Sequence, residues 1–246
     1  MRSFFAKHEW IHNDHIEITG QECNHIKNVL RMQEGDSIHV LSGDNYCYDC
    51  MIKSIGNDSI VCDIENKYIR ATELCVDVTF FQGLPKSDKM ELVIQKSVEL
   101  GAAGVVPVVM DRSVVKLDDK KKASKVNRWN TIAENAAMQS RRAKIPEVGN
   151  VIDFKTALDK AKYYDHIFLP YECAEGFKYT KEVFDRVKCG DSVAVFVGPE
   201  GGFSPEETEA AKEAGAKIIT LGKRILRTET VALMIMSIFN YLFEED

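Results

Sequence analysis

Two stretches near the C-terminus place glycine backbone and charged side chains where ligands bind in many proteins. Residues 197–204 read Val-Gly-Pro-Glu-Gly-Gly-Phe-Ser, and residues 221–230 read Leu-Gly-Lys-Arg-Ile-Leu-Arg-Thr-Glu-Thr. Each stretch follows a short apolar run and leads into a helical pattern. Peptide N–H and C=O groups at such strand-to-helix loops are free to bind ligands in open α/β folds. We therefore predict a small-molecule site, for a nucleotide-like cofactor, at these two loops.

The first loop is predicted to lie directly ahead of a helix N-terminus. Ser204 is followed by Pro205 and, three residues on, by Glu207, which is the pattern of a capping box. The pair Gly201-Gly202 permits positive φ or a close approach of ligand to backbone. No phosphate-binding glycine motif is present, and Glu200 would repel a phosphate. The loop therefore favours a cationic ligand, with a tight strand–helix turn as the alternative.

The second loop places a cation where the helix dipole opposes it. Arg227 stands at the start of a predicted helix and is followed by Glu229. Such a position indicates a function for the arginine. The sequence leaves open an ion pair with Glu229 and a contact with a phosphate.

Basic residues gather in one part of a chain whose net charge is −6. Residues 116–144 hold nine Lys or Arg and three acidic residues, so this stretch is locally +6. Lys86 and Lys89 follow the first strand expected in the second half. The basic stretch 116–144 can neutralise several phosphates of a nucleic acid, and the alternative is a solvated helix face.

Residues 1–70 are predicted to form a β-rich domain, a small barrel or sandwich. Glycine-containing turns separate its expected strands, which are 16–18, 37–41, 46–55 and 59–65. One amphipathic helix is expected over 21–32, and the polar segment 66–74 is expected to be a linker.

Residues 75–246 alternate strand and helix patterns, which predicts an α/β domain with a parallel sheet covered on both faces. The expected strands are 76–81, 105–109, 167–169, 193–197 and 217–221. The expected helices are 88–100, 124–142, one from residue 153, 180–187, 205–214 and 230–243.

The cysteines and the absence of long apolar runs bear on compartment. Seven cysteines, an odd number, and an early charged N-terminus predict reduced thiols and a cytoplasmic protein without a membrane span. Cys47 and Cys50 are three residues apart in an expected strand, so their thiols should face opposite sides. No second Cys/His pair stands at a suitable spacing, and no metal site is predicted.

Three motifs taken in order resemble one family. Residues 82–91, 198–204 and 221–230 look like the small-subunit ribosomal RNA uridine-N3 methyltransferase E family, and the likeness covers essentially the whole chain, including His25 and Leu30-Arg31. The resemblance implies a PUA-like RNA-binding β-barrel at 1–70 and a SPOUT methyltransferase domain at 75–246. It also implies a trefoil knot in that second domain and a homodimer.

The same resemblance implies S-adenosylmethionine as the cofactor and 16S ribosomal RNA, or the small ribosomal subunit, as the partner. Cofactor contacts carried over by motif are Leu169, Gly198, Gly201, Leu221, Gly222, Ile225, Leu226 and Thr230. RNA contacts are expected at Arg31, Lys86, Lys89, Arg128, Arg141 and Arg142. Two positions depart from the family pattern: Val231 replaces an alanine, and Met138 stands where an acid is common.

A mechanism follows if uridine N3 is methylated. N3 carries a proton at neutral pH, so the site must help to remove it and to stabilise the resulting anion. Arg227 is the expected stabiliser and Glu229 a candidate base, although Glu229 could instead orient Arg227. A non-catalytic RNA-binding assembly factor and a nucleotide-phosphate enzyme are the alternatives. The uridine, the form of the RNA substrate and the base are not fixed by sequence.

Overall fold

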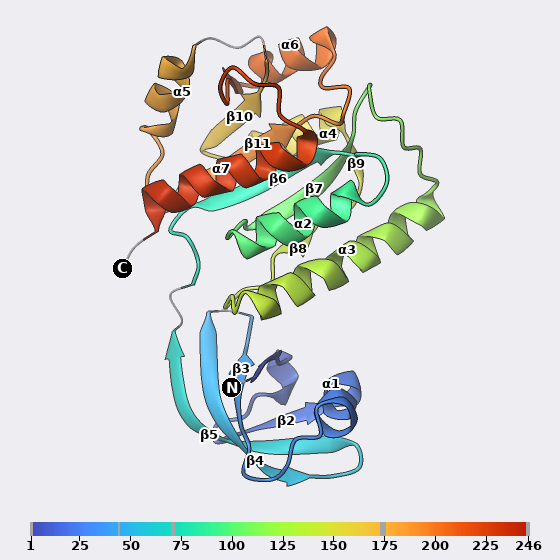
Figure 1. The fold of residues 1–246 in the computed structure, drawn as a ribbon, viewed down its shortest axis with the longest axis vertical. Coiled ribbons are helices and arrows are strands. Elements are labelled where there is room, and N and C mark those ends of the chain that lie inside the picture. The colour runs from blue at the N-terminus through green and yellow to red at the C-terminus, as the bar shows by residue number, and fades with distance from the viewer. Residues whose placement is uncertain (1, 44, 70–71, 173–175, 245–246) are drawn as a thin grey trace. The chain divides into compact units, whose positions relative to one another are not determined.

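The computed structural model describes residues 2–43, 45–69, 72–172 and 176–244 (Figure 1). The chain forms two compact units, of which the first comprises Met1–Glu73 with Ala137–Ile145 and the second Leu74–Ala136 with Pro146–Asp246. The sequence predicts a boundary between residues 70 and 75. Residues 137–145 belong to the first unit, although the sequence assigns them to the second domain and places 137–142 in the expected helix 124–142. The helix ends earlier, at Gln139.

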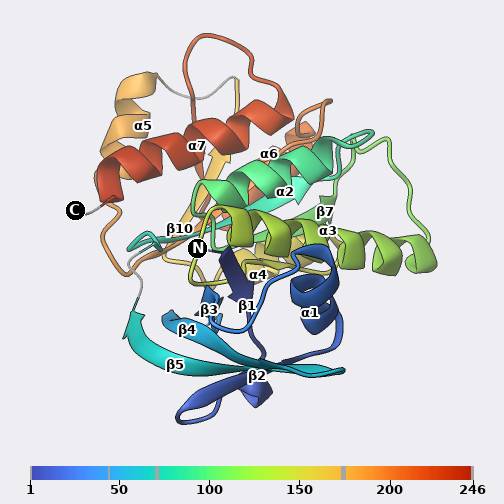
Figure 2. The ribbon, with the colours of Figure 1, turned by 60° about the horizontal axis from the view of Figure 1, so that its bottom comes forward.

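A five-stranded sheet in the order β1-β3-β4-β5-β2 forms the first unit (Figure 2). Its strands are β1 (Arg2–Phe5), β2 (His15–Thr19), β3 (Ser37–Leu41), β4 (Tyr46–Ile55) and β5 (Ser59–Ile69). β1 pairs parallel with β3, and the other pairs are antiparallel. The bounds of β3 and β4 agree with the sequence prediction. β1 was not predicted, since Phe4 and Phe5 are both buried and hide the alternation of a strand.

The expected linker over 66–74 is wrong in its first part, because β5 continues through Ile69. Asn66 pairs with Asp49, and Lys67 pairs with Tyr48. The Lys67 ammonium lies 4.2 Å from the ring centroid of Tyr46, so polar side chains of this segment pack on the neighbouring strand. Pairing partners, rather than local hydrophobicity, determine the strand here.

The expected helix over residues 21–32 is shorter and irregular. An α-helix, α1 (Gly20–Asn24), continues into a π-helix, η2 (His25–Val29), and Arg31 then adopts a positive φ of 52°. A 3₁₀ turn, η1 (His8–Trp10), precedes β2. The core of this unit consists of alternating strand residues together with the two apolar side chains of the helical segment. These residues include Ile16, Ile18, Cys23, Ile26, Ile38, Val40, Ile52 and Ile60.

The second unit contains a parallel sheet in the order β12-β10-β11-β6-β7-β8, with β9 also paired to β7. Its strands are β6 (Asp77–Gly83), β7 (Gly104–Val109), β8 (Glu147–Val148), β9 (Ile152–Asp153), β10 (His166–Pro170), β11 (Ser192–Val197) and β12 (Lys217–Ile219). The alternation of strands and helices is confirmed. β8 and β9 were not predicted, because two residues carry no periodic signal.

Helices cover both faces of this sheet (Figure 1). They are α2 (Lys89–Glu99), α3 (Asp119–Gln139), α4 (Phe154–Ala161), α5 (Phe177–Phe184), α6 (Pro205–Glu213) and α7 (Thr228–Phe243). Adjacent strand residues point to opposite faces. Phe81 and Phe196 therefore stack in the cluster that includes residues of α4 and α6. On the opposite face, Phe168 contacts Phe184 of α5, which contacts Phe239 of α7.

One pair of cysteines is oxidised, although the sequence predicts reduced thiols. Cys75 and Cys189 form a disulfide, so the prediction that the thiols are reduced is wrong for these two. Cys50 and Cys62 are free and buried, and burial raises the pKa of each thiol to about 12. Cys173 lies outside the described residues. Within the described part of the chain, none of the helices has the length and apolar character that crossing a bilayer requires.

Candidate functional site

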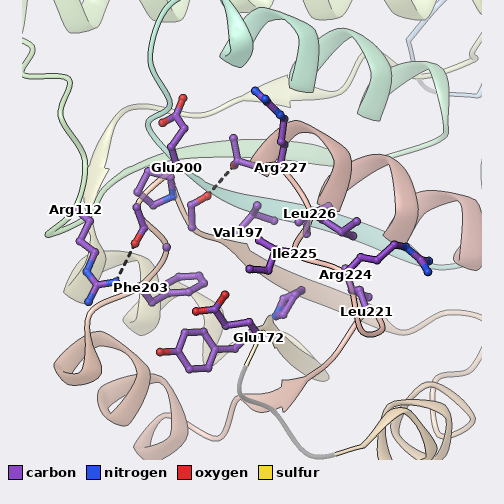
Figure 3. A pocket seen from close by; sticks show the side chains of 18 of the residues that line it. Arg112, Glu172, Val197, Glu200, Phe203, Leu221, Arg224, Ile225, Leu226 and Arg227 are labelled. Carbon is purple, nitrogen blue, oxygen red and sulfur yellow. Dashed lines mark hydrogen bonds between the residues drawn. The ribbon is translucent and has the colours of Figure 1, made fainter.

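A pocket of about 460 Å³ opens in the second unit beyond the carboxyl ends of β10, β11 and β12 (Figure 3). All strands of a parallel sheet end at the same edge, which brings together loops that are distant in sequence. The pocket is lined by residues 170–172, 197–203, 220–222 and 224–228, with Lys89, Arg112 and Val231. The two glycine-bearing loops of the sequence thus meet at one site.

The first loop is fixed ahead of α6 by the predicted capping box. Ser204 Oγ accepts the Glu207 backbone N–H at 3.2 Å, and Glu207 Oε2 accepts the Ser204 backbone N–H at 2.9 Å. Two further bonds tie the box to the loop after β7, because Ser204 Oγ donates to Asp111 Oδ2 and Glu207 Oε1 accepts the Asp111 N–H. The carboxylate of Glu207 is therefore buried yet paired with backbone donors, which holds the loop in one conformation.

Glycine is required in the loops for close packing and for positive φ. A Cβ on Gly83 would lie 2.6 Å from Cδ and 2.8 Å from the backbone N of Pro199, so no side chain fits between these loops. Gly202 and Gly222 have φ of 67° and 111°, which only glycine adopts without strain. Arg112 Nη1 donates to Gly201 O at 2.9 Å, which secures the tip of the first loop (Figure 3).

A chain of buried hydrogen bonds joins a strand end, the first glycine loop and a helix start, and the sequence does not predict it. Gln82 is fully buried at the end of β6, and its Nε2 donates to Thr228 Oγ1 at 2.8 Å. Thr228 Oγ1 donates in turn to Gly198 O at 2.7 Å. The hydroxyl therefore connects β6, the first glycine loop and the start of α7. A glutamine within an apolar run is the signal that could have indicated this role, since buried amides need hydrogen-bond partners.

The structure brings most of the predicted cofactor residues to this pocket. Gly198, Gly201, Leu221, Gly222, Ile225 and Leu226 line it. Leu169 is instead buried in the apolar cluster beneath, and Thr230 is exposed on α7 outside the lining. Pro170, Tyr171 and Glu172, which follow Leu169, line the pocket and were not predicted. Val231, the departure from the family pattern, also lines it.

The two candidate catalytic residues lie in different places. Arg227 lines the pocket with an exposed side chain, and no ion pair of its guanidinium is found among the described residues. Glu229 does not line the pocket, and its Oε2 lies 3.6 Å from Lys89 Nζ. The alternative of an Arg227–Glu229 ion pair is therefore wrong. Glu229 forms its ion pair with Lys89 of α2 and not with Arg227.

Lys89 and Lys86 both meet Glu200. Lys89 Nζ lies 3.1 Å from Glu200 Oε1, and the Lys86 backbone N–H donates to both Glu200 oxygens. Partial burial raises the pKa of Glu200, but backbone N–H donors and the Lys89 ammonium outweigh it and leave the pKa below its ordinary value. Glu200 is therefore a carboxylate at neutral pH and a weak proton acceptor.

The remaining predicted RNA contacts differ in exposure. Arg31 and Arg141 are exposed at positive φ in the first unit. Arg128 is exposed but pairs with Glu91, with 2.7 Å between Arg128 Nε and Glu91 Oε1.

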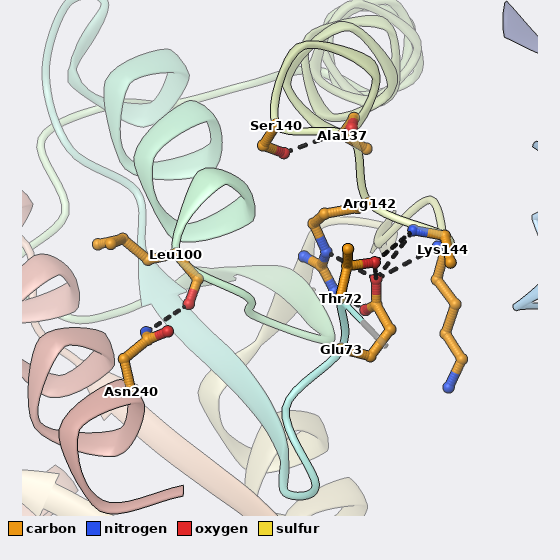
Figure 4. Close-up of polar contacts among 9 residues, drawn as sticks. Thr72, Glu73, Leu100, Ala137, Ser140, Arg142, Lys144 and Asn240 are labelled. Atoms are coloured by element: carbon orange, nitrogen blue, oxygen red, sulfur yellow. Dashed lines mark hydrogen bonds and ion pairs between the residues drawn. The ribbon is translucent and has the colours of Figure 1, made fainter. Parts of the chain in front are cut away.

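Arg142 is 3% exposed and forms an ion pair with Glu73, which also accepts backbone N–H groups of Ala143 and Lys144 (Figure 4). Its guanidinium is therefore held inside the first unit rather than presented to a ligand. Within the described ranges, no group of three or more His, Cys, Asp or Glu side chains is placed to hold a metal ion.

Comparisons with known proteins agree with this arrangement. A family model described as an RNA methyltransferase domain matches residues 72–240, and one described as an RNA methyltransferase PUA domain matches 18–65. The chain is 39% identical over 234 residues to ribosomal RNA small subunit methyltransferase E of Bacillus subtilis, covering 93% of this chain and 91% of that protein.

Two solved structures are similar over nearly the whole length. One, titled only as a hypothetical protein, has a TM-score of 0.92 at 36% identity and covers 99% of each chain. The other is a ribosomal RNA small subunit methyltransferase E from Neisseria gonorrhoeae bound to S-adenosylmethionine, with a TM-score of 0.83, 27% identity and 98% of each chain covered. The chain described here belongs to the ribosomal RNA small subunit methyltransferase E family of RNA methyltransferases.

Proposed function

We propose that this protein is an S-adenosylmethionine-dependent methyltransferase that methylates N3 of a specific uridine in 16S ribosomal RNA. The observation that carries the proposal is the pocket formed by the 197–203 and 220–228 loops in a chain of this family. A relative of the same fold has S-adenosylmethionine bound. The N3 position and the uridine are the finer parts of the proposal and rest on the motif resemblance.

The residues present fit a cationic cofactor of nucleoside size. The pocket volume of about 460 Å³ lies in the usual range for small-molecule sites. Gly198, Gly201 and Gly222 carry no side chain, so a ligand can approach their backbone closely, and Ile225 and Leu226 offer apolar surface. Glu172 and Glu200 line the same pocket beside Lys89, Arg112, Arg224 and Arg227. Glu200 already pairs with Lys89, so the Glu172 carboxylate is the group that suits positive charge on the ligand. When bound, S-adenosylmethionine supplies a sulfonium methyl group that transfers to the acceptor nitrogen.

The chain's own residues orient the acceptor and stabilise charge. Loss of the N3 proton to solvent leaves an anion that is shared with the uracil O2 and O4 atoms. The exposed Arg227 guanidinium at the pocket wall is placed to stabilise that anion. The Watson–Crick edge carries N3, so the uridine must be unpaired or flipped out. Positioning of the two reactants supplies most of the acceleration.

RNA backbone contacts are assigned to the exposed cations of each unit. Arg31 and Arg141 serve in the first unit, and Lys86 and Arg128 in the second. Arg142 is left out because its charge is paired and buried. Each such contact should contribute to a salt-dependent affinity.

The proposal extends to assembly and topology. The chain threads through a trefoil knot in the second unit, and the hydrogen bond that ties Thr228 to Gly198 supports a close passage of these two segments.

Two copies form a homodimer through α2 and α7, helices that pack together and expose Leu92, Tyr241 and Leu242. The protein acts in the cytoplasm, where ribosomal subunits are assembled. Sedimentation at micromolar concentration tests the dimer.

Two measurements test the function. Ribosomal RNA from cells with and without the gene is compared by mass spectrometry, and loss of one N3-methyluridine is expected. Calorimetry with purified protein should show S-adenosylmethionine binding in a one-site titration. An unchanged methyluridine content, together with no binding at millimolar cofactor, would instead indicate a non-catalytic RNA-binding assembly factor.

A further inference from the structure

Lys89 is a cation in an unfavourable position. It is the first residue of α2, where the positive end of the helix dipole disfavours an ammonium. Its side chain is 27% exposed, so much of its stem is removed from water. Two carboxylates compensate, since Nζ lies 3.1 Å from Glu200 Oε1 and 3.6 Å from Glu229 Oε2.

The three side chains of this cluster reach the pocket unequally. Lys89 and Glu200 line it, whereas Glu229 does not. Glu229 is 17% exposed, and its Oε2 is shielded from solvent with no hydrogen-bond partner apart from the ion pair with Lys89. A general base must reach the proton that it removes. Of this ion pair, Lys89 is therefore the member that lines the pocket.

Other charged groups near the pocket do not replace Lys89 as the partner of Glu229. Glu91 on α2 pairs with Arg128 of α3, and Arg112 donates to the backbone of Gly201. Arg227 precedes Glu229 in sequence, but its guanidinium is exposed and makes no ion pair within the described chain. The ion pair between Glu229 and Lys89 is thus the interaction that fixes the Glu229 carboxylate.

We propose that Glu229 is a positioning residue that acts through Lys89, holding the Lys89 ammonium at the pocket wall. Lys89, rather than Glu229, then faces the reacting uracil and stabilises the charge that develops on it. This inference rests on the proposed methyl transfer to uridine. It assigns Lys89 to the reaction site and not to the RNA backbone, and it removes Glu229 as the base.

A double-mutant cycle on turnover tests the proposal. Glu229→Gln is expected to lower kcat about tenfold to a hundredfold, and Lys89→Met by at least as much, in the range of lost charge-stabilising groups. Because the two residues act as one unit, the double variant should lose no more than Lys89→Met within about threefold. Lys89→Arg should restore part of the rate. Multiplying losses, or loss of the acidic limb of the pH–rate profile in Glu229→Gln alone, would overturn the proposal.

A second readout does not depend on activity. The wild type, Glu229→Gln, Lys89→Met and the double variant are melted without cofactor, and the loss of Tm in the double variant should be smaller than the sum of the single losses. Additive losses would show that the pair does not form and would reject the inference. A wild-type protein that binds cofactor and RNA but transfers no methyl group would instead reject the proposed function, while the melting cycle would still decide the pairing.

A matched control lies on the same helix. Lys96 Nζ pairs with Glu99 Oε2 at 2.7 Å, outside the pocket lining. Lys96→Met removes a lysine ion pair from α2 without touching the site, so its kcat should equal that of the wild type. Calorimetric affinity for S-adenosylmethionine should stay within about threefold in all variants, which excludes collapse of the pocket.

Discussion

At the scale of single residues, the partner of a charged side chain determines what it can do. Glu229 and Arg227 are two positions apart, yet Glu229 pairs with Lys89 of another helix and Arg227 stays exposed at the pocket. Arg142 and Arg141 are adjacent, yet one is buried against Glu73 and the other is exposed. The residue types indicate only that these side chains are charged. Their neighbours in the structure show which cations are held in ion pairs and which are exposed.

Arg227→Ala is the sharpest test at this scale. Because Arg227 lines the pocket and its guanidinium makes no ion pair in the described chain, its removal should lower turnover by about tenfold to a thousandfold. The free energy of unfolding should change by less than about 0.5 kcal/mol, as for other exposed residues. Single-turnover methylation and urea unfolding measure the two quantities. Unchanged turnover with normal cofactor binding would remove Arg227 from the mechanism.

At the scale of elements, the pocket depends on loops that are held at both ends. The capping box joins the first glycine loop to α6 and to Asp111, and the Gln82–Thr228–Gly198 chain joins it to β6 and α7. These bonds keep backbone groups in place before any ligand binds. A loop fixed in this way loses less conformational entropy on binding, which favours affinity.

Ser204→Ala tests whether the capping box only stabilises the fold or also shapes the pocket. Loss of an N-cap costs about 1 kcal/mol of unfolding free energy, and here the hydrogen bond to Asp111 is lost too. Asp153→Ala is the control, because its side chain caps α4 at Thr156 N outside the pocket lining. Both variants should lose stability, but only Ser204→Ala should weaken cofactor binding in calorimetry. Equal affinities would mean that the box does not shape the pocket.

Gly83→Ala tests the packing of two loops against each other. The added Cβ would meet the backbone of Pro199 at 2.8 Å, so the first glycine loop must shift. Overpacking of this kind costs about 1–3 kcal/mol of unfolding free energy. Gly149→Ala is the matched control, since its Cβ would have an ordinary contact at 3.6 Å. Thermal melts and cofactor titrations should show a loss for Gly83→Ala alone; a normal affinity would show that the loop tolerates the shift.

At the scale of the whole molecule, the pocket and the disulfide of the second unit lie at opposite edges of its parallel sheet. The carboxyl ends of its strands carry the pocket. The disulfide joins Cys75, just before β6, to Cys189, just before β11. It therefore lies at the amino ends of these two paired strands, away from the pocket. The cross-link spans 114 residues of sequence, so it restricts the unfolded chain strongly.

Cys75→Ser should therefore lower the stability of the oxidised protein. The chain-entropy model gives a loss of up to about 4–5 kcal/mol for a loop of this length. The variant and the wild type should melt together once a thiol reductant is present, because the wild-type bond is then open. Equal Tm values without reductant would show that the disulfide does not form in the purified protein. Cys189→Ser should behave as Cys75→Ser does.

The alternation of strands and helices, the capping box and the two glycine loops were all predictable from the residues alone. These features depend on local rules of period, capping and turn chemistry, which act over a few residues. The sequence also indicated the family, because three motifs occur in order. Most of the residues carried over to the cofactor do line the pocket, with Leu169 and Thr230 as the exceptions.

The contacts between groups that are distant in sequence became known only from the folded chain. The Lys89–Glu229 pair joins the first turns of α2 and α7, and the Gln82 chain joins β6, the first glycine loop and α7. The course of β5 past Glu65, the burial of Arg142 and the Cys75–Cys189 bond depend in the same way on partners far along the chain. Contacts between residues far apart in sequence leave no periodic signal in a single sequence. Their stability depends on both partners, and a short stretch of sequence contains only one of them.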